Sequence, residues 1–452
     1  MIRASDLPRP PMRMPLIGDL WRINPARPVQ SEYEIAQKVG PLFQLDLAGG
    51  SVLIATDDLA INSIADEETW CKFVAGPFLV LREQLIGRGL LTAKNSDPLW
   101  ADANEVLQPG FKQQAMRSYH HAMHDAVAEL CTLWADRAGE QIDVSTDMNR
   151  LTSEVIARAG FGTTFNALSP TTKHGFSEQL SAALREASAA ANSVPGLSNI
   201  RKLLLAQKAK PLQKTARKVA QLPTGATDST LLARMCPASG ATLPADNIVD
   251  QCLTFLIAGN ETTAGTLGVC LHYLANDPRL QDAVRDELDA AGGLEALADY
   301  DTISKLRLTR RIVDEALRLW PVAPAYFRRA RADTTIETRD FGTVQIPKNT
   351  VVMALTLGAH RDKVTWGPDA DEFRPDRFTA ANLRKYPDRV YRPFGIGPRS
   401  CIGRQFALHE AVLAIAAIAG TFNVSATSGS DLVMAEQITL KPKNLTVTVG
   451  AR

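Results

Sequence analysis

The most informative stretch of the sequence runs Phe394-Gly395-Ile396-Gly397-Pro398-Arg399-Ser400-Cys401-Ile402-Gly403. It leads into an apolar segment that starts at Arg404 and is expected to be helical to about Ala419. Free backbone N–H groups and the helix dipole at such a start favour the thiolate form of Cys401. Since the thiolate is the form of cysteine that binds metals, the segment predicts a ligating sulfur at Cys401.

Four neighbours of Cys401 suit a flat, carboxylate-bearing ligand. Gly397 and Gly403 let the backbone approach such a ligand closely. Phe394 can cover the sulfur, and Arg399 can pair with a carboxylate. Together they predict a binding loop for a cofactor of this shape.

These ten residues resemble the haem-binding loop of cytochromes P450. The resemblance implies haem b (iron protoporphyrin IX) as the cofactor, with Cys401 as the ligand of the haem iron. Thiolate ligation pushes electron density onto iron and favours cleavage of the O–O bond. The implied activity is that of a haem-thiolate monooxygenase, which uses dioxygen to hydroxylate or otherwise oxidise a small hydrophobic organic substrate.

A second segment, residues 254–263, places an acid, a hydroxyl and a glycine inside an apolar helix expected from about Pro244 to Asn276. Such breaks of a local rule often mark function. In cytochromes P450 this helix crosses the distal haem face. By resemblance, Ala258 and Gly259 open a groove for dioxygen, while Thr262 hydrogen-bonds it and Glu261 relays protons. The alternative is that Thr262 only donates to the preceding helical turn.

A third signal is the pair Glu315 and Arg318, which lie at i and i+3 on one helix face. In the family this pair meets a later arginine, here Arg377. Buried charges need partners, so a closed triad would fix the proximal side of the fold. An isolated pair of this spacing is usually a solvated helix pair, and its meaning depends on the downstream Cys401 loop.

Resemblance extends over nearly the whole chain, most closely to the haem domain of self-sufficient bacterial fatty-acid hydroxylases. The matching segments are Trp100, 107–116, 255–263, 315–325, 360–362 and 406–411. Trp100 and Lys72 match positions that contact haem propionates there. No fused reductase follows, since the chain ends at Arg452, so separate electron donors are expected: a ferredoxin or flavodoxin with its reductase.

Four departures affect the substrate and the haem contacts. Gly50 and Ile54 stand where the fatty-acid enzymes carry an Arg and a Tyr that anchor the carboxylate. Asn104 replaces an Arg or His at a propionate, and Leu91 replaces a Phe that shapes the pocket. The candidate substrates are therefore a fatty-acyl chain, a specialised metabolite or a carrier-tethered group.

A basic stretch carries a further hypothesis about the partner. Seven cations and no acid lie in residues 201–218: Arg201, Lys202, Lys208, Lys210, Lys214, Arg217 and Lys218. By resemblance it falls in the helices over the substrate entrance, where it could attract an acyl or peptidyl carrier protein. The simpler alternative is a solvated helix face.

Composition limits the class of protein, its partners and its compartment. The 452 residues are 45% hydrophobic with a net charge of +1, which predicts a large core and no pull towards nucleic acid. Six cysteines without CxxC spacing fit a reducing cytoplasm. No apolar run approaches the ~18 residues of a membrane span, so no membrane anchor is expected.

Periodicity predicts a mainly α protein with small β-sheets, organised as a single haem domain over residues 1–452. A hairpin is expected at Leu42–Leu47 and Ser51–Ala55 around Gly49-Gly50, with further strands in 341–354 and 440–449. The β portion is expected to draw on both ends of the chain. The resemblance implies the cytochrome P450 fold, a triangular prism with one long central helix over the haem.

His120, His121 and His124 invite a metal-site interpretation. No acid or third histidine of suitable spacing is expected to join His120 and His124, so surface histidines are predicted instead.

Two other functions compete with the monooxygenase. A peroxide-dependent haem-thiolate enzyme would not need Glu261 and Thr262, whereas a non-catalytic haem gas sensor would need neither a proton relay nor a substrate pocket.

Overall fold

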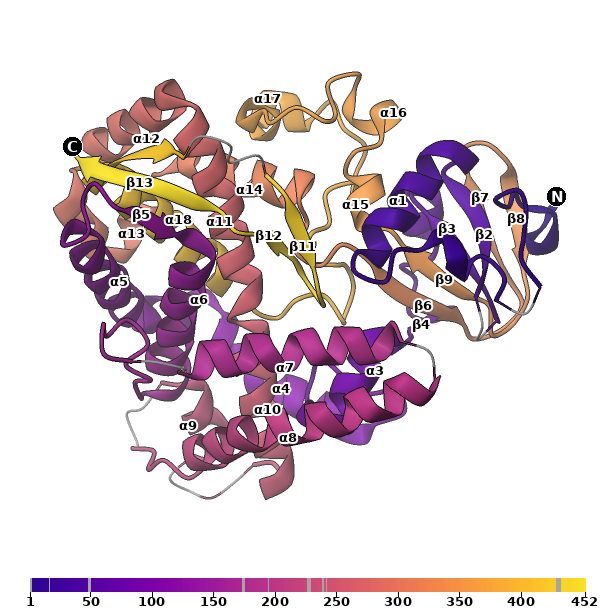
Figure 1. Ribbon diagram of the computed structural model, residues 1–452, viewed down its shortest axis with the longest axis horizontal. Coiled ribbons are helices and arrows are strands. Elements are labelled where there is room, and N and C mark those ends of the chain that lie inside the picture. Colours follow the sequence, from indigo (N-terminus) through magenta and orange to yellow (C-terminus); the bar gives the residue numbers. More distant parts are fainter. Residues whose placement is uncertain are drawn as a thin grey trace. The chain divides into compact units, whose positions relative to one another are not determined.

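The computed structural model describes residues 2–15, 17–47, 50–172, 175–193, 195–225, 229–237, 240, 242–427 and 432–452. The chain forms two compact units (Figure 1). The first, here called the sheet unit, comprises Met1–Gly76 and Leu317–Cys401. The second, the helical unit, comprises Pro77–Ala316 and Ile402–Arg452.

The sheet unit is built around a five-stranded sheet of order β2-β3-β9-β6-β4. Its strands are β2 (Leu42–Leu47), β3 (Gly50–Ala55), β4 (Trp70–Lys72), β6 (Tyr326–Ala330) and β9 (Val351–Ala354). The predicted hairpin is confirmed, because β2 and β3 pair antiparallel with Leu42 opposite Ala55 and Leu47 opposite Gly50. Gly49 of its predicted turn lies outside the described residues.

A second sheet of order β1-β8-β7 lies in the same unit. Its strands are β1 (Ile2–Arg3), β7 (Thr334–Thr338) and β8 (Gly342–Ile346). Residues from both sheets, among them Trp70, Ile336 and Val344, share one buried cluster with Ile61. The helices of the unit are η1 (Ala4–Asp6), η2 (Leu20–Arg22), α1 (Pro28–Val39), α2 (Asp58–Ser63), α15 (Thr356–Ala359), α16 (Lys363–Trp366), η7 (Pro375–Phe378) and α17 (Ala380–Leu383).

Helices dominate the helical unit. They are α3 (Gly76–Leu81), η3 (Arg82–Ile86), α4 (Pro98–Leu107), η4 (Gln108–Phe111), α5 (Gln113–Ala135), α6 (Val144–Val155), η5 (Ile156–Gly160), α7 (Phe176–Ala191), α8 (Pro195–Ala220), α9 (Leu231–Met235), α10 (Ala245–Ala258), α11 (Glu261–Asn276), α12 (Pro278–Ala290), η6 (Leu294–Ala298), α13 (Tyr300–Ile303), α14 (Arg307–Leu319) and α18 (Arg404–Thr421). α3 and α14 begin or end in the sheet unit. Asp97 and Asp277 cap α4 and α12, each followed by a proline that suits the first helical position.

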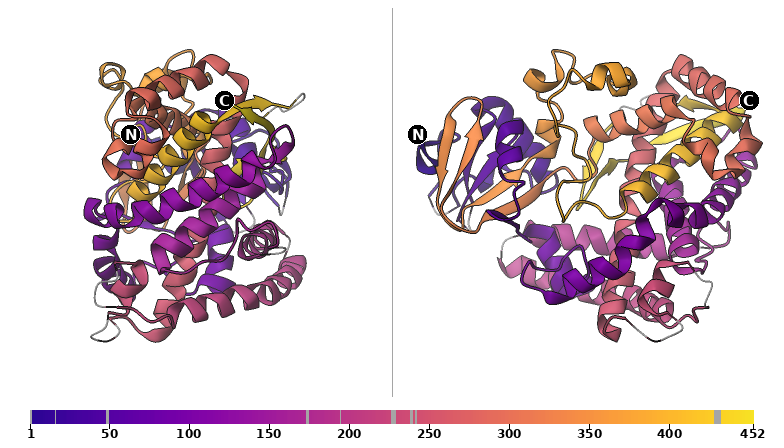
Figure 2. Two further views of the ribbon diagram at one scale, coloured as in Figure 1. Left: turned by 90° about the vertical axis from the view of Figure 1, so that its left-hand side faces the viewer. Right: turned by 180° about the vertical axis from the view of Figure 1, so that it is seen from behind.

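The predicted helix after Cys401 is confirmed as α18, which packs against α5, α11 and α12 (Figure 2). Residues 410–420 of α18 are all buried, so the helix is apolar on every side. This explains why its sequence shows no polar face. Among the described residues, no helix is long and apolar enough to cross a membrane.

The β structure draws on both ends of the chain, as predicted, and the two ends contribute to separate sheets. The N-terminal hairpin pairs with β9, whereas the C-terminal tail forms a sheet of order β10-β13-β5. The strands of that sheet are β5 (Gln141–Asp143), β10 (Phe422–Ala426) and β13 (Thr446–Ala451). A two-stranded sheet pairs β11 (Met434–Glu436) with β12 (Leu440–Pro442). Pairing between strands so distant in sequence has no local signal.

The helix expected from about Pro244 to Asn276 is present with one interruption, because the structure divides it into α10 and α11 at Gly259–Asn260. Asn260 has φ −88° and ψ −79°, in the αR region but away from the ideal helical values. Its buried side-chain amide donates to the Asn149 carbonyl at 3.1 Å and to the Ser153 hydroxyl on α6. These bonds attach the interrupted turn to α6.

Candidate functional site

The Cys401 loop is a tight turn of the sheet unit shaped by two glycines. Gly395 and Gly397 have φ of 70° and 74°, which side chains other than glycine adopt at a cost. The Cys401 amide donates to the Phe394 carbonyl at 2.8 Å and closes the loop. Cys401 is exposed, three residues before the first residue of α18. The loop therefore presents a sulfur that a ligand can reach.

Cations gather beside this loop within the sheet unit. Burial, together with the charges of Arg399 and Arg328, lowers the pKa of Lys72 to about 7, against the opposing effect of Glu67. Arg328 is buried and pairs with Glu67 at 2.6 Å. An anionic group bound near Lys72 and Arg399 would relieve the repulsion between them. The carboxylates of haem fit this requirement.

Arg318 and Arg377 organise one segment of the sheet unit. Arg318 is fully buried and donates to the carbonyls of His360 and Ala370, both at 2.7 Å. Arg377 donates to the Trp366 carbonyl at 2.8 Å and pairs with the Asp369 carboxylate at 2.8 Å. The two arginines thus hold residues 366–372. Glu315 is fully buried on α14, three residues before Arg318.

The accessible positions in the middle of α10 and α11 coincide with the predicted oxygen-side residues. Along residues 251–271, every residue is buried except Ala258, Gly259 and Thr262. Thr262 follows Ala258 by four residues and Gly259 by three, which places it on the same face as both. A β-carbon on Gly259 would lie 2.9 Å from the Phe255 carbonyl oxygen, so the position has no room for a side chain. Within residues 251–271, this otherwise buried stretch therefore keeps one open patch.

Thr262 and Glu261 differ in what they contact. The Thr262 hydroxyl donates to the Ala258 carbonyl at 2.7 Å, which is the bond of the alternative interpretation. Glu261 is buried and pairs with Lys441 at 2.7 Å, while Thr439 donates to its second oxygen at 3.1 Å. The acid beside the open patch is therefore held by β12 and by the residue just before it.

A second buried acid lies close by on α18. Glu410 is fully buried, and burial raises the pKa of its carboxyl well above the usual range, opposed by a hydrogen bond with Thr263. Burial therefore favours the protonated form of Glu410. A protonated carboxyl can donate a hydrogen bond to the turn that follows Thr262, a role that an ionised acid could not have.

The remaining predicted positions divide by exposure. Trp100 and Asn104 lie half-buried on α4, and Leu91 is half-buried in the loop before α4. Ile54 is fully buried in β3, and Gly50 begins that strand at φ 122°. Neither Gly50 nor Ile54 offers a polar group to a carboxylate.

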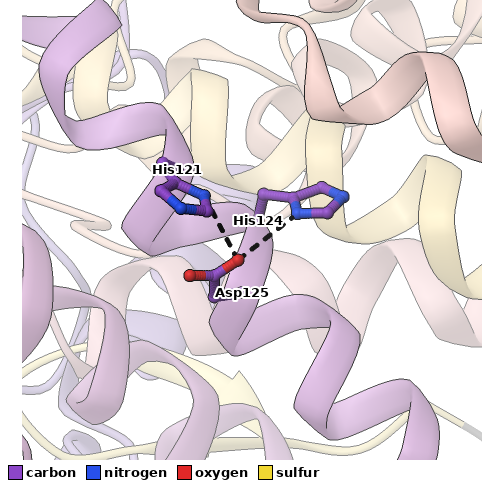
Figure 3. A group of neighbouring side chains, drawn as sticks. All are labelled: His121, His124 and Asp125. Carbon is purple, nitrogen blue, oxygen red and sulfur yellow. Dashed lines mark ion pairs between the residues drawn. The ribbon is translucent and has the colours of Figure 1, made fainter.

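The histidine prediction was wrong in two respects. His120 is buried, with one ring nitrogen 2.8 Å from His409 Nε2 and the other 3.0 Å from the Leu297 carbonyl. An acid does join the other two histidines: one oxygen of Asp125 lies 3.3 Å from His121 Nδ1 and 3.6 Å from His124 Nδ1 (Figure 3). The i,i+4 spacing of His121 and Asp125 was the signal that could have revealed this group.

Lys441, Thr439 and Glu410 were also missed. Lys441 pairs with an acid 180 positions earlier in the chain. No local pattern predicts such a contact, because the tail around Lys441 shows only the alternation of a strand.

Comparisons with known proteins agree with the resemblance to cytochromes P450, and they do so over nearly the whole chain. A sequence model described as "Cytochrome P450" matches residues 8–449. A solved cytochrome P450 structure has a TM-score of 0.88 and 36% identity, covering 99% of both chains.

Curated relatives are longer proteins. The bifunctional cytochrome P450/NADPH–P450 reductase 1 of Bacillus subtilis (strain 168) is 34% identical over 100% of this chain. A self-sufficient cytochrome P450 monooxygenase of Aspergillus kawachii is 32% identical over 98% of it. The chain spans 43% of the length of each of these two relatives.

Proposed function

This chain belongs to the cytochrome P450 family, and we propose that it is a haem-thiolate monooxygenase that oxidises a small hydrophobic substrate with dioxygen. The observation that carries the proposal is the open patch of Ala258, Gly259 and Thr262 within the otherwise buried residues 251–271. It leaves a hydroxyl accessible with a buried acid next to it in sequence. That combination suits proton delivery to a small ligand.

The family's cofactor is haem b, and the residues that we propose to hold it come from several segments of the chain. Cys401 would supply the thiolate, with Phe394 and Gly403 around it. Lys72, Arg399 and Trp100 would bind the two propionates. When bound, the haem supplies oxygen activation, to which the thiolate contributes electron density.

Glu261 and Thr262 would move the protons. Thr262 can donate or accept at the open patch once its bond to Ala258 is exchanged. Glu261 can take up a proton from solvent and pass it towards Thr262 only if its carboxylate first leaves Lys441 and Thr439. Lys441 would therefore control when the acid is free. A peroxide-dependent enzyme or a gas sensor has no use for this arrangement.

The substrate is proposed to be a neutral acyl chain or a specialised metabolite. Neither Gly50 nor the buried Ile54 has a charged or hydrogen-bonding side chain that could bind a carboxylate. Titrating the holoprotein with a fatty alcohol and the matching fatty acid tests this. We expect the alcohol to displace the iron-bound water at lower concentration, as seen in the optical spectrum; preference for the acid would contradict it.

An acyl or peptidyl carrier protein is a narrower proposal, which the structure of α8 weakens. Arg201 and Lys208 pair with Glu186 at 3.1 and 3.0 Å, and Lys202 pairs with Glu83 at 2.9 Å. Lys210, Lys214, Arg217 and Lys218 are exposed and carry what is left of the hypothesis. Reversing Lys210 and Lys214 to Glu must weaken carrier binding at low salt if a carrier docks there. Unchanged affinity would reduce the stretch to a solvated surface.

The electron donor is proposed to be a separate protein. A ferredoxin or flavodoxin with its reductase is the class expected from the sequence, whereas the relatives' names indicate an NADPH–P450 reductase. Oxygen uptake coupled to product formation should appear with one of these donor systems and substrate. Uptake without product under every donor would contradict a monooxygenase.

We further propose that residues 1–452 act as one haem domain, since the family match spans residues of both units. The six cysteines all lie in the described residues and none is joined in a disulfide, which supports the proposed cytoplasmic location.

A further inference from the structure

The group His121, His124 and Asp125 on α5 has no part in the proposed oxygen chemistry. One ligand atom from each of the three residues lies within 4.8 Å of the other two. Both imidazole rings turn towards the same carboxylate oxygen (Figure 3). Three groups of this chemistry on one side of a helix are what a transition-metal ion needs.

The distances suit a small tetrahedral ion. Zinc holds nitrogen and oxygen at about 2.0–2.2 Å, so ligand atoms on a tetrahedron stand about 3.4 Å apart. Asp125 Oδ1 lies 3.3 Å from His121 Nδ1 and 3.6 Å from His124 Nδ1. The third separation, between the ligand nitrogens of His121 and His124, is at most 4.8 Å, so side-chain rotation would bring the three atoms around one centre.

The helix fixes this arrangement. His121 and Asp125 are four residues apart and His121 and His124 are three apart, so their Cβ atoms lie on one face of the regular helix α5. His124 also packs near the buried His120, with ring centroids 6.3 Å apart. His120 is itself held by His409 and the Leu297 carbonyl, which gives His124 a rigid neighbour.

The group is also accessible. The side chains of His121, Asp125 and His124 are 86%, 48% and 29% exposed. A hydrated ion can reach them from solvent, and water can fill the fourth position. We propose that His121, His124 and Asp125 form a binding site for a divalent transition-metal ion, with Zn²⁺ as the best fit to two imidazoles and one carboxylate.

Zn²⁺ itself is the probe. Untagged holoprotein, freed of loosely bound metal by a chelator, is titrated with Zn²⁺ by calorimetry, and bound zinc is measured after dialysis. We expect one Zn²⁺ per chain in addition to the haem iron, and a higher midpoint of thermal unfolding when Zn²⁺ is present. The haem spectrum reports that each variant is folded.

Three variants and one control locate the ion. His121→Ala, His124→Ala and Asp125→Asn should each weaken Zn²⁺ binding at least tenfold and remove the thermal shift. His272→Ala, a half-buried histidine on α11, should leave both unchanged. Absence of Zn²⁺ binding, or equal binding by wild type and His121→Ala, would overturn the site and leave a hydrogen-bonded His–Asp group.

Discussion

At the scale of single residues, Thr262 shows how one hydroxyl can serve both structure and chemistry. Its bond to the Ala258 carbonyl satisfies the hydroxyl in the resting helix, as buried helical threonines often do. That bond alone would suggest a structural role. Its half-exposed position on the open patch is what distinguishes Thr262 from its buried neighbours.

Thr262→Ala should leave the haem bound but uncouple turnover, because protons would no longer be delivered in order. Reducing equivalents would then appear as peroxide or water instead of product. The measurement compares NADPH consumed with product formed. Thr266→Ala is the matched control, since Thr266 makes the same bond one turn later, to the Thr262 carbonyl at 3.0 Å, but is buried. Undiminished coupling in Thr262→Ala would remove this residue from the mechanism.

The Glu261–Lys441 pair is the second residue-scale feature. Lys441→Met leaves the buried Glu261 carboxylate without its cationic partner. We expect this to lower the free energy of unfolding by about 3 kcal/mol. Combining it with Glu261→Gln removes the charge and should restore part of that loss. Denaturant titrations of the two single variants and the double variant give the coupling between the sites. Strictly additive losses would mean that the ion pair does not stabilise the fold.

At the scale of elements, the sequence supported those parts of the fold that local patterns encode. Alternation around Gly50 predicted β2 and β3 with the correct pairing, and the apolar run after Cys401 predicted α18. The break at Gly259–Asn260 could not be predicted. Asn260 there bonds to Asn149 and Ser153, more than 100 positions earlier in the chain.

The same limit applies to the candidate site. The Cys401 loop and the residues of the open patch are local motifs, so they could be identified from spacing. Lys441 holds Glu261 through a contact between distant segments, and only the fold reveals it. Asp125 was within reach of sequence reasoning but was overlooked.

Helix α18 carries a prediction about pH, because Glu410 lies fully buried in it. Burial raises the pKa of Glu410, so the folded state keeps the proton while the unfolded chain loses it above its ordinary pKa near 4.5. The stability of the folded state is therefore lost as pH rises above that value, by up to about 1.4 kcal/mol per pH unit. The glutamine in Glu410→Gln cannot ionise, so this variant should not show that loss of stability as pH rises.

Urea titrations at pH 5 and pH 8 test the expectation. The stability of Glu410→Gln relative to wild type should be greater at pH 8 than at pH 5. Glu436→Gln, a change at a largely buried acid in β11, is the comparison. An equal difference between Glu410→Gln and wild type at both pH values would show that Glu410 is ionised in the folded protein.

At the scale of the whole molecule, the candidate haem residues come from widely separated segments. Lys72, Trp100, residues 258–262 and residues 394–403 belong to different elements of the chain. The chemistry that we propose for them is the binding of one flat, dianionic, iron-bearing group. The identity of the iron ligand is therefore the claim on which the proposed function depends.

The most direct test is the optical spectrum of the reduced carbon monoxide complex. Wild type should show the strongly red-shifted Soret band of thiolate ligation. Cys401→Ser should lose it, whereas Cys236→Ser, a change at a half-buried thiol, should keep it. A red-shifted band that persists in Cys401→Ser would contradict the assignment of Cys401 as the thiolate ligand.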